Sequence, residues 1–152
     1  LRTRIGLASG PMVVGNMGST RRFDYTIMGS DVNLASRLEG VNKVYGTGIL
    51  IAGSTMDLLE GAIPCREIDI VMVVGQKTPV TIWEPLLETG PWLENYSRAL
   101  DYYRKGEFRK ALDLFESLEE DPPSRTMADR CRKFIKDGAP DEWSGVWVLS
   151  SK

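Results

Sequence analysis

Residues 21–39 have the sequence RRFDYTIMGSDVNLASRLE, in which a short strand is followed by a glycine and then by the start of a helix. The β-favouring run at residues 25–28 predicts the strand. A helix is expected to start at Val32, with Ser30 or Asp31 as its N-cap. Apolar side chains then recur at helical spacing and predict one buried face. They are Leu34, Ala35, Leu38 and Val41.

Further strands are predicted on both sides of this unit. They cover residues 4–9, 12–15 and 49–52, and a hairpin formed by residues 68–74 and 80–83. A short helix is expected over residues 54–59. Because strands and helices are interspersed, the first part of the chain is predicted to be a mixed α+β fold.

The composition changes after residue 87. Eleven of the fifteen glycines lie in residues 1–87, whereas charged side chains number 24 among the 65 residues that follow and 16 among those first 87. The turn-forming cluster at residues 88–91 marks the boundary. The sequence therefore predicts two units, residues 1–87 and residues 88–152.

The second unit is predicted to be helical. Two apolar stripes separated by Gly106 are typical of an antiparallel helix pair. The first stripe is Leu93, Tyr96, Leu100 and Tyr103, and the second is Phe108, Ala111, Leu112 and Phe115. A third helix is expected after the two prolines at residues 122–123, with Ser124 as its cap. Trp143 and Trp147 are costly to leave in water, so the tail that carries them is expected to pack back on one of the units.

The composition of the 152 residues excludes several classes of function. A net charge of −2 and a pI near 5.3 offer no basic surface for nucleic acid. The sequence contains no histidine, which excludes Ser–His–Asp catalysis and histidine-dependent metal sites. Cys65 and Cys131 are too few for a disulfide scaffold and are expected to be free thiols in a reducing cytoplasm. No apolar run is long enough to span a membrane, so we expect no membrane contact by this chain.

Asn33 and Arg37 are the first candidate site residues. They lie four positions apart near the start of the predicted helix, hence on one face, beside the apolar stripe. A helix N-terminus also favours anions. A polyphosphate could bind where the Asn33 amide, the Arg37 guanidinium and the helix N-terminus lie together. By pattern alone, a solvated polar helix face is the commoner explanation.

The pattern D-Y-T-x-x-G-x-x-V-N-x-A-x-R-L-E, with the preceding RIGLASGPMVVGNMG, resembles the C-terminal half of the catalytic domain of class III adenylate and guanylate cyclases. The hairpin REIDIVMVVGQKTPVTIWEPL resembles the arm that closes this domain. The resemblance covers residues 1 to about 87. It implies a ferredoxin-like α/β domain that dimerises head to tail, with active sites at the dimer interface.

The resemblance also implies a reaction and three residue roles. The family converts a nucleoside triphosphate to a 3′,5′-cyclic monophosphate and pyrophosphate with two divalent metal ions, Mg²⁺ or Mn²⁺. Asn33 matches the asparagine that orients the ribose, and Arg37 matches the arginine that stabilises charge on the α-phosphate. Thr26 lies where the family reads the purine. Because guanylate cyclases usually carry cysteine there, Thr26 implies adenine and therefore ATP as substrate.

Other parts of the site are expected outside this sequence. By the resemblance, both metal-binding aspartates and the lysine that pairs with Thr26 at adenine precede residue 1, so we expect no metal site here. This chain alone is then expected to be inactive, as one piece of a homodimeric adenylate cyclase whose upstream region could anchor it to a membrane. Two alternatives stay open: a regulatory module with a cyclase fold but no activity, which an intact Thr26, Asn33 and Arg37 disfavour, and a guanylate cyclase.

Two further features bear on interactions. Residues 71–74 are apolar where the family commonly has basic residues, which predicts dry packing against either a partner subunit or the C-terminal tail. The helical unit resembles one tetratricopeptide repeat. The matching residues are Tyr102, Ala111, Phe115 and Pro123. Because one repeat cannot bury its own face, these helices are expected to dock on the cyclase half or on a dimer mate, and peptide binding is the alternative.

Overall fold

The computed structural model describes residues 3–19 and 21–150. The strands in these ranges are β1 (Ile5–Leu7), β2 (Val13–Ser19), β3 (Arg22–Met28), β4 (Ile49–Ala52), β5 (Cys65–Met72), β6 (Val80–Pro85) and β7 (Trp147–Val148). The helices are α1 (Ser30–Tyr45), α2 (Gly53–Leu59), α3 (Trp92–Arg104), α4 (Phe108–Glu116) and α5 (Pro122–Asp137). The predicted mixed α+β fold is confirmed. No helix in the described ranges is long and apolar enough to cross a membrane.

The main sheet has the strand order β1-β4-β6-β5-β7 in the described residues. The pairs β4–β6 and β5–β6 are antiparallel, whereas β1–β4 and β5–β7 are parallel. Helix α1 packs on β1 and β4, and α3 packs on β5. The approach of β1 to α1 needs a glycine, because a Cβ on Gly6 would lie 2.2 Å from the Ala35 carbonyl oxygen. This arrangement places the N-terminal half of α1 beside the turn that joins β5 to β6.

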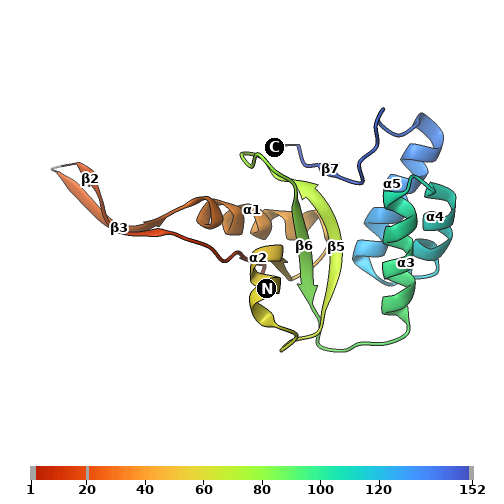
Figure 1. The fold of residues 1–152 in the computed structure, drawn as a ribbon, viewed down its shortest axis with the longest axis horizontal. Coiled ribbons are helices and arrows are strands. Elements are labelled where there is room, and N and C mark those ends of the chain that lie inside the picture. The colour runs from red at the N-terminus through yellow and green to blue at the C-terminus, as the bar shows by residue number, and fades with distance from the viewer. Residues whose placement is uncertain (1–2, 20, 151–152) are drawn as a thin grey trace.

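Strands β2 and β3 form a separate antiparallel hairpin, the extended hairpin, which projects from the rest of the molecule (Figure 1). The strand predicted at residues 25–28 is therefore longer, and it pairs with the strand predicted at 12–15. The hairpin predicted at residues 68–83 is confirmed, and its strands β5 and β6 lie within the main sheet, between β4 and β7. Side-chain burial explains this placement: Val71 and Val73 are buried. Residues 71–74 were predicted to pack against either a partner subunit or the C-terminal tail. The structure shows the tail there, because Val71 pairs with Trp147.

Helix α1 begins two residues earlier than predicted. Its N-cap is Gly29, and no side chain caps it, so neither Ser30 nor Asp31 has the predicted capping role. The Asp31 carboxylate instead lies over Gly10, where a Cβ would be 1.9 Å from Oδ2. Asp24 lies within β3. The predicted core face of α1 is confirmed for Leu34, Leu38 and Val41, which are buried, whereas Ala35 is half-buried.

The predicted helical unit folds as three helices, with α4 between α3 and α5. Asp121, and not Ser124, is the N-cap of α5: its side chain accepts a 3.0 Å hydrogen bond from the Ser124 backbone N–H. The two prolines occupy the first turn, where a missing N–H costs nothing.

One hydrophobic core contains residues from both sides of residue 87. Its fully buried members include Leu38, Leu50, Ile82, Tyr96, Tyr103, Phe115 and Met127. The tail contributes as well, because the Trp143 indole N–H donates a 3.0 Å hydrogen bond to the carbonyl oxygen of Tyr103. The expectation that the helices dock on the cyclase half is thus confirmed, while the division into two units stays a prediction.

Candidate functional site

A polar groove of about 690 Å³ lies between the N-terminal half of α1 and the turn that joins β5 to β6. It is lined by Ser30, Asn33, Ser36 and Arg37 from α1, and by Val74, Gly75, Gln76, Lys77 and Thr78 from the turn. The groove thus brings together both candidate residues of α1 and Lys77. Lys77 is a second cation beside Arg37 and lies 40 positions after it in the sequence.

The helix presents its two candidate residues at the rim of its buried face. Leu34 and Leu38 are 5% and 0% exposed and seat α1 on the sheet. Asn33 and Arg37 lie one turn apart on the exposed side of the same helix. Their predicted position at the rim of the apolar stripe is confirmed.

The second wall of the groove is a tight turn. Gly75 has a φ of +86°, a left-handed conformation that favours glycine, and the Gln76 backbone N–H donates a 3.0 Å hydrogen bond to the Val73 carbonyl. The Gln76 side-chain amide reaches the Ser30 carbonyl oxygen at 3.5 Å, which connects the turn to the start of α1. This geometry places Lys77 on the groove.

Sequence reasoning did not select Lys77. A lysine in a hairpin turn is ordinarily a solvated charge, and neither its type nor its neighbours distinguish it. Only the pairing of β5 with β6, together with the seating of α1, brings Lys77 and Arg37 to one groove.

The third candidate, Thr26, does not line this groove. It lies on β3 in the extended hairpin, half-buried and paired with Gly15 of β2. A Cβ at Gly15 would meet no atom within 4 Å, so the space on that side of the hairpin is open. Within one chain, the structure therefore separates Thr26 from Asn33 and Arg37.

The groove is suited to an anion and not to a metal ion. Its wall residues offer a guanidinium, an ammonium, amides and hydroxyls, which donate hydrogen bonds to phosphate oxygens. They include no carboxylate, the ligand type that Mg²⁺ prefers. Across the described residues, no group of three or more acidic or cysteine side chains could hold a metal ion. The residues present therefore do not fit the divalent ions that the resemblance implies.

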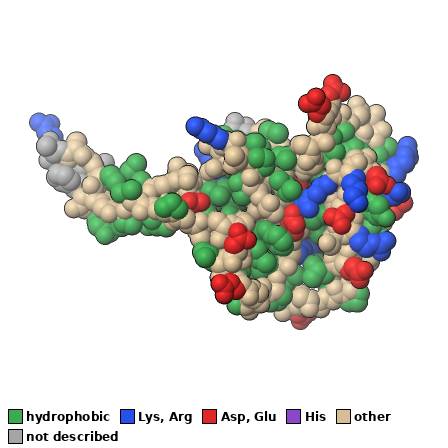
Figure 2. Space-filling model, viewed as in Figure 1, with side chains coloured by type: hydrophobic (Ala, Val, Ile, Leu, Met, Phe, Trp, Pro, Cys, Tyr) green, Lys and Arg blue, Asp and Glu red, His purple; other side chains and the backbone are tan. Residues whose placement is uncertain are grey.

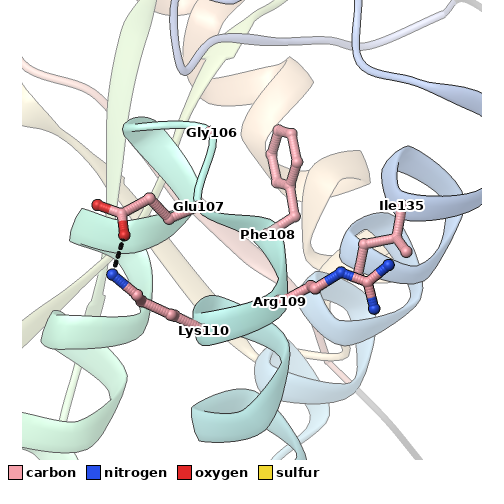
Figure 3. A pocket seen from close by; sticks show the side chains of 6 residues that line it. All are labelled: Gly106, Glu107, Phe108, Arg109, Lys110 and Ile135. Carbon is pink, nitrogen blue, oxygen red and sulfur yellow. Dashed lines mark hydrogen bonds and ion pairs between the residues drawn. The ribbon is translucent and has the colours of Figure 1, made fainter.

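A second pocket of about 390 Å³ lies at the turn between α3 and α4 (Figure 3). Its Lys110 forms an ion pair with Glu107, so its charge is already balanced. Phe108 points away from that pair and contacts the Tyr103 and Phe134 rings of the aromatic core. This pocket has no convergent set of free polar groups and does not resemble a catalytic site.

Comparison with known proteins agrees with these observations. Residues 1–84 match the family model described as adenylate and guanylate cyclase catalytic domain. The chain is 41% identical over 83 residues to adenylate cyclase 1 of Rhizobium meliloti, a match that covers 55% of this chain and 12% of that protein. It is 30% identical over 154 residues to the terminal-differentiation specific adenylate cyclase of Dictyostelium discoideum, covering 90% of this chain and 7% of that protein.

The second of these matches extends beyond residue 84 and so includes much of the helical unit. Among solved structures, the adenylyl cyclase CyaB from P. aeruginosa is similar, with a TM-score of 0.50 and 40% sequence identity over 57% of this chain and 43% of that chain. The chain spans only a small part of the curated relatives it matches. The family model nevertheless covers more than half of the 152 residues. The chain therefore belongs to the adenylate and guanylate cyclase catalytic domain family.

Proposed function

We propose that this chain is the C-terminal part of an adenylate cyclase that converts ATP to 3′,5′-cyclic AMP and pyrophosphate. The observation that carries the proposal is the convergence of Asn33, Arg37 and Lys77 on one groove. An amide and two cations suit a ribose followed by a chain of phosphates. The relatives named as adenylate cyclases support the same reaction.

The groove residues would act by positioning and by charge. In the reaction, the ribose 3′-oxygen releases its proton to solvent and forms a bond to the α-phosphorus, while the bond from that phosphorus to the bridging oxygen breaks and pyrophosphate leaves. Negative charge grows on the α-phosphate oxygens, and a fixed guanidinium at Arg37 stabilises it. Asn33 orients the ribose so that the attacking oxygen is in line. Lys77 adds a second positive charge to the groove.

Thr26 is proposed to read adenine from the extended hairpin of a second copy or after that hairpin moves. The hairpin carries exposed apolar side chains along its length (Figure 2). They include Val13, Val14, Tyr25, Ile27 and Met28, which are 48% to 76% exposed. An apolar surface of this kind is typical of a protein interface, and it supports a homodimer. The Thr26 hydroxyl can accept a hydrogen bond from the adenine amino group.

The divalent metal ions of the family are proposed to be bound by residues that are not part of this sequence, because the groove lacks carboxylates. On the same ground, we propose that the 152 residues alone form no cyclic AMP. The free Cys65 and Cys131 support a reducing, cytoplasmic location. The antiparallel pair α3–α4 is proposed to be a single tetratricopeptide-like repeat that is stabilised by docking on the sheet.

The proposal is tested with the purified full-length protein. Cyclic nucleotide formation is measured with ATP and with GTP, each in the presence of Mg²⁺ or Mn²⁺, and kcat/KM is compared. We expect a clear preference for ATP. Equal use of GTP would contradict the adenylate assignment, and formation of neither product would contradict cyclase activity altogether.

A further inference from the structure

The C-terminal end of α1 is joined to α5, a helix of the second unit. The Thr126 hydroxyl donates a 3.0 Å hydrogen bond to the Val44 carbonyl oxygen, and Arg130 Nη2 donates a 2.8 Å hydrogen bond to the Tyr45 hydroxyl. Gly46, which ends α1 with a φ of +70°, is so near α5 that a Cβ there would lie 2.7 Å from Pro122 Cβ. Three consecutive residues at the end of α1 thus contact α5.

A buried charge pair makes this junction rigid. Asp69 of β5 is fully buried, accepts a 2.6 Å hydrogen bond from the Tyr45 hydroxyl and forms an ion pair with Arg130. The Arg130 guanidinium lies 4.0 Å from the centre of the Trp147 ring, so the C-terminal tail covers it. Charged groups out of water hold their geometry because each loses a specific partner when it moves.

The other end of α1 carries the proposed site residues, and their side chains have no restraint of this kind. Among the described residues, the side chains of Asn33 and Arg37 make no hydrogen bond or ion pair within the chain, and both are exposed. Their positions are therefore set by the orientation of α1 as a whole. Arg37 and Tyr45 are eight residues apart, about 12 Å along the helix axis. A tilt of about 5° at Tyr45 then moves Arg37 by about 1 Å.

We propose that α5 is a positioning element for the cyclase reaction: Arg130, acting through Tyr45, fixes the orientation of α1 and thereby the place of Asn33 and Arg37 in the groove. This inference rests on the proposed function. The expected effect on the rate is large, because a displacement of 1 Å at a reacting group can lower the rate about 100-fold. Arg130 and Tyr45 touch no substrate and are positioning residues.

Tyr45→Phe is the variant of choice. It removes only the hydroxyl that joins α1 to the ion pair and leaves Arg130 paired with Asp69. The matched control is Tyr96→Phe, because Tyr96 is equally buried and its hydroxyl donates a 3.0 Å hydrogen bond to the Ile68 carbonyl, which joins α3 to β5 without touching α1. We expect both variants to lower the thermal unfolding midpoint by similar amounts.

The first measurement uses the 152-residue chain and needs no activity. Spin labels are attached to cysteines placed at Ser36 on α1 and at Leu58 on α2, both exposed, in a Cys65→Ser background in which the buried Cys131 stays unlabelled. Pulsed EPR then reports the distance distribution. Tyr45→Phe is expected to shift or broaden it, and Tyr96→Phe is expected to leave it as in the parent. Equal distributions in all three, or equal changes in both variants, would overturn the proposal.

The second measurement is kcat and KM for ATP in the full-length protein. Tyr45→Phe is expected to lower kcat at least about tenfold with KM within twofold, while Tyr96→Phe keeps both. An unchanged kcat in Tyr45→Phe, or an equal loss in the two variants, would contradict positioning. If the unmodified protein forms no cyclic AMP, the proposed function fails, and the EPR comparison alone then decides the positioning role.

Discussion

Arg130 of α5 and Tyr45 of α1 are 85 residues apart in the sequence, yet the guanidinium donates a 2.8 Å hydrogen bond to the phenol oxygen in the buried interior. Burial raises the pKa of the Tyr45 phenol well above its usual value, and the nearby Asp69 carboxylate adds to the shift. The phenol is therefore neutral at physiological pH and serves as a hydrogen-bond donor to Asp69. This network links the cyclase-like segment to the helices that follow it.

Breaking the ion pair on one side should be far more costly than removing both charges. Arg130→Met leaves Asp69 buried without its cation and is expected to lower the free energy of unfolding by about 3–5 kcal/mol. The double variant Arg130→Met/Asp69→Asn is expected to recover part of that loss. Urea unfolding followed by tryptophan fluorescence measures both. A double variant no more stable than Arg130→Met would argue against this account of the network.

Asp121 has two separable roles. Its carboxylate forms two hydrogen bonds with the Arg66 guanidinium, at 2.7 and 2.9 Å, and it also caps α5. Asp121→Asn keeps a capping oxygen but loses the charge, which should cost about 2 kcal/mol. Asp121→Ala loses both and should cost about 1 kcal/mol more. Equal unfolding free energies for the two variants would show that the cap contributes nothing.

The Cys131 thiol is expected to make the free energy of unfolding depend on pH in the alkaline range. Burial raises the pKa of its thiol from 9.0 to about 12, although the charges of Arg130 and Arg132 act in the opposite direction. Between these pH values the thiol has lost its proton in the unfolded chain but keeps it in the folded chain. The free energy of unfolding is therefore highest below pH 9 and falls as the pH rises toward 12. The slope approaches about 1.4 kcal/mol per pH unit for one proton.

This contribution is isolated by comparing the parent chain with Cys131→Ala in urea unfolding at pH 8, 9 and 10. The parent is expected to lose more stability over that range than the variant. If the free energies of unfolding of the parent and of Cys131→Ala fell equally with pH, the thiol would not titrate in this way.

Thr26 is expected to contribute to the choice of base. In the full-length protein, Thr26→Ala removes the hydroxyl that we propose accepts a hydrogen bond from the adenine amino group, and kcat/KM for ATP relative to GTP is expected to fall without reversing. The effect is modest because a hydroxyl can also donate, and so discriminates weakly. Thr26→Ser, which keeps the hydroxyl, is the control. If Thr26→Ala left the ratio unchanged, Thr26 would not be a base-reading residue.

Local features of the fold could be predicted from the sequence, whereas its long-range contacts could not. The apolar spacing of Leu34 and Leu38 was sufficient to predict the buried face of α1, and hence the exposure of Asn33 and Arg37 beside it. The hairpin of β5 and β6 was predicted as a pair, but nothing in its residues shows which strands lie on either side of it in the sheet. That placement depends on what lies beside Val71 and Met72, and these residues pair with a tail more than seventy residues away in the chain.

The same limit applied to the site. Sequence reasoning selected Asn33 and Arg37 because they share a helix, and it omitted Lys77 because only tertiary contacts bring that residue to the groove. It did not select Arg130 or Tyr45 at all. A buried ion pair between residues 61 positions apart, Arg130 and Asp69, leaves no periodic signal in the sequence.

The central claim is that Arg37 stabilises charge that develops during cyclisation. The most direct measurement is kcat for cyclic AMP formation at saturating ATP in the full-length protein and in Arg37→Ala, with Arg109→Ala, an exposed arginine on α4, as the matched control. A fixed charge of this kind contributes about 10²–10³ in rate, so Arg37→Ala should lower kcat by that factor with little change in KM, and Arg109→Ala should match the parent. A near-normal kcat in Arg37→Ala would contradict the claim and make this face of α1 an ordinary solvated surface.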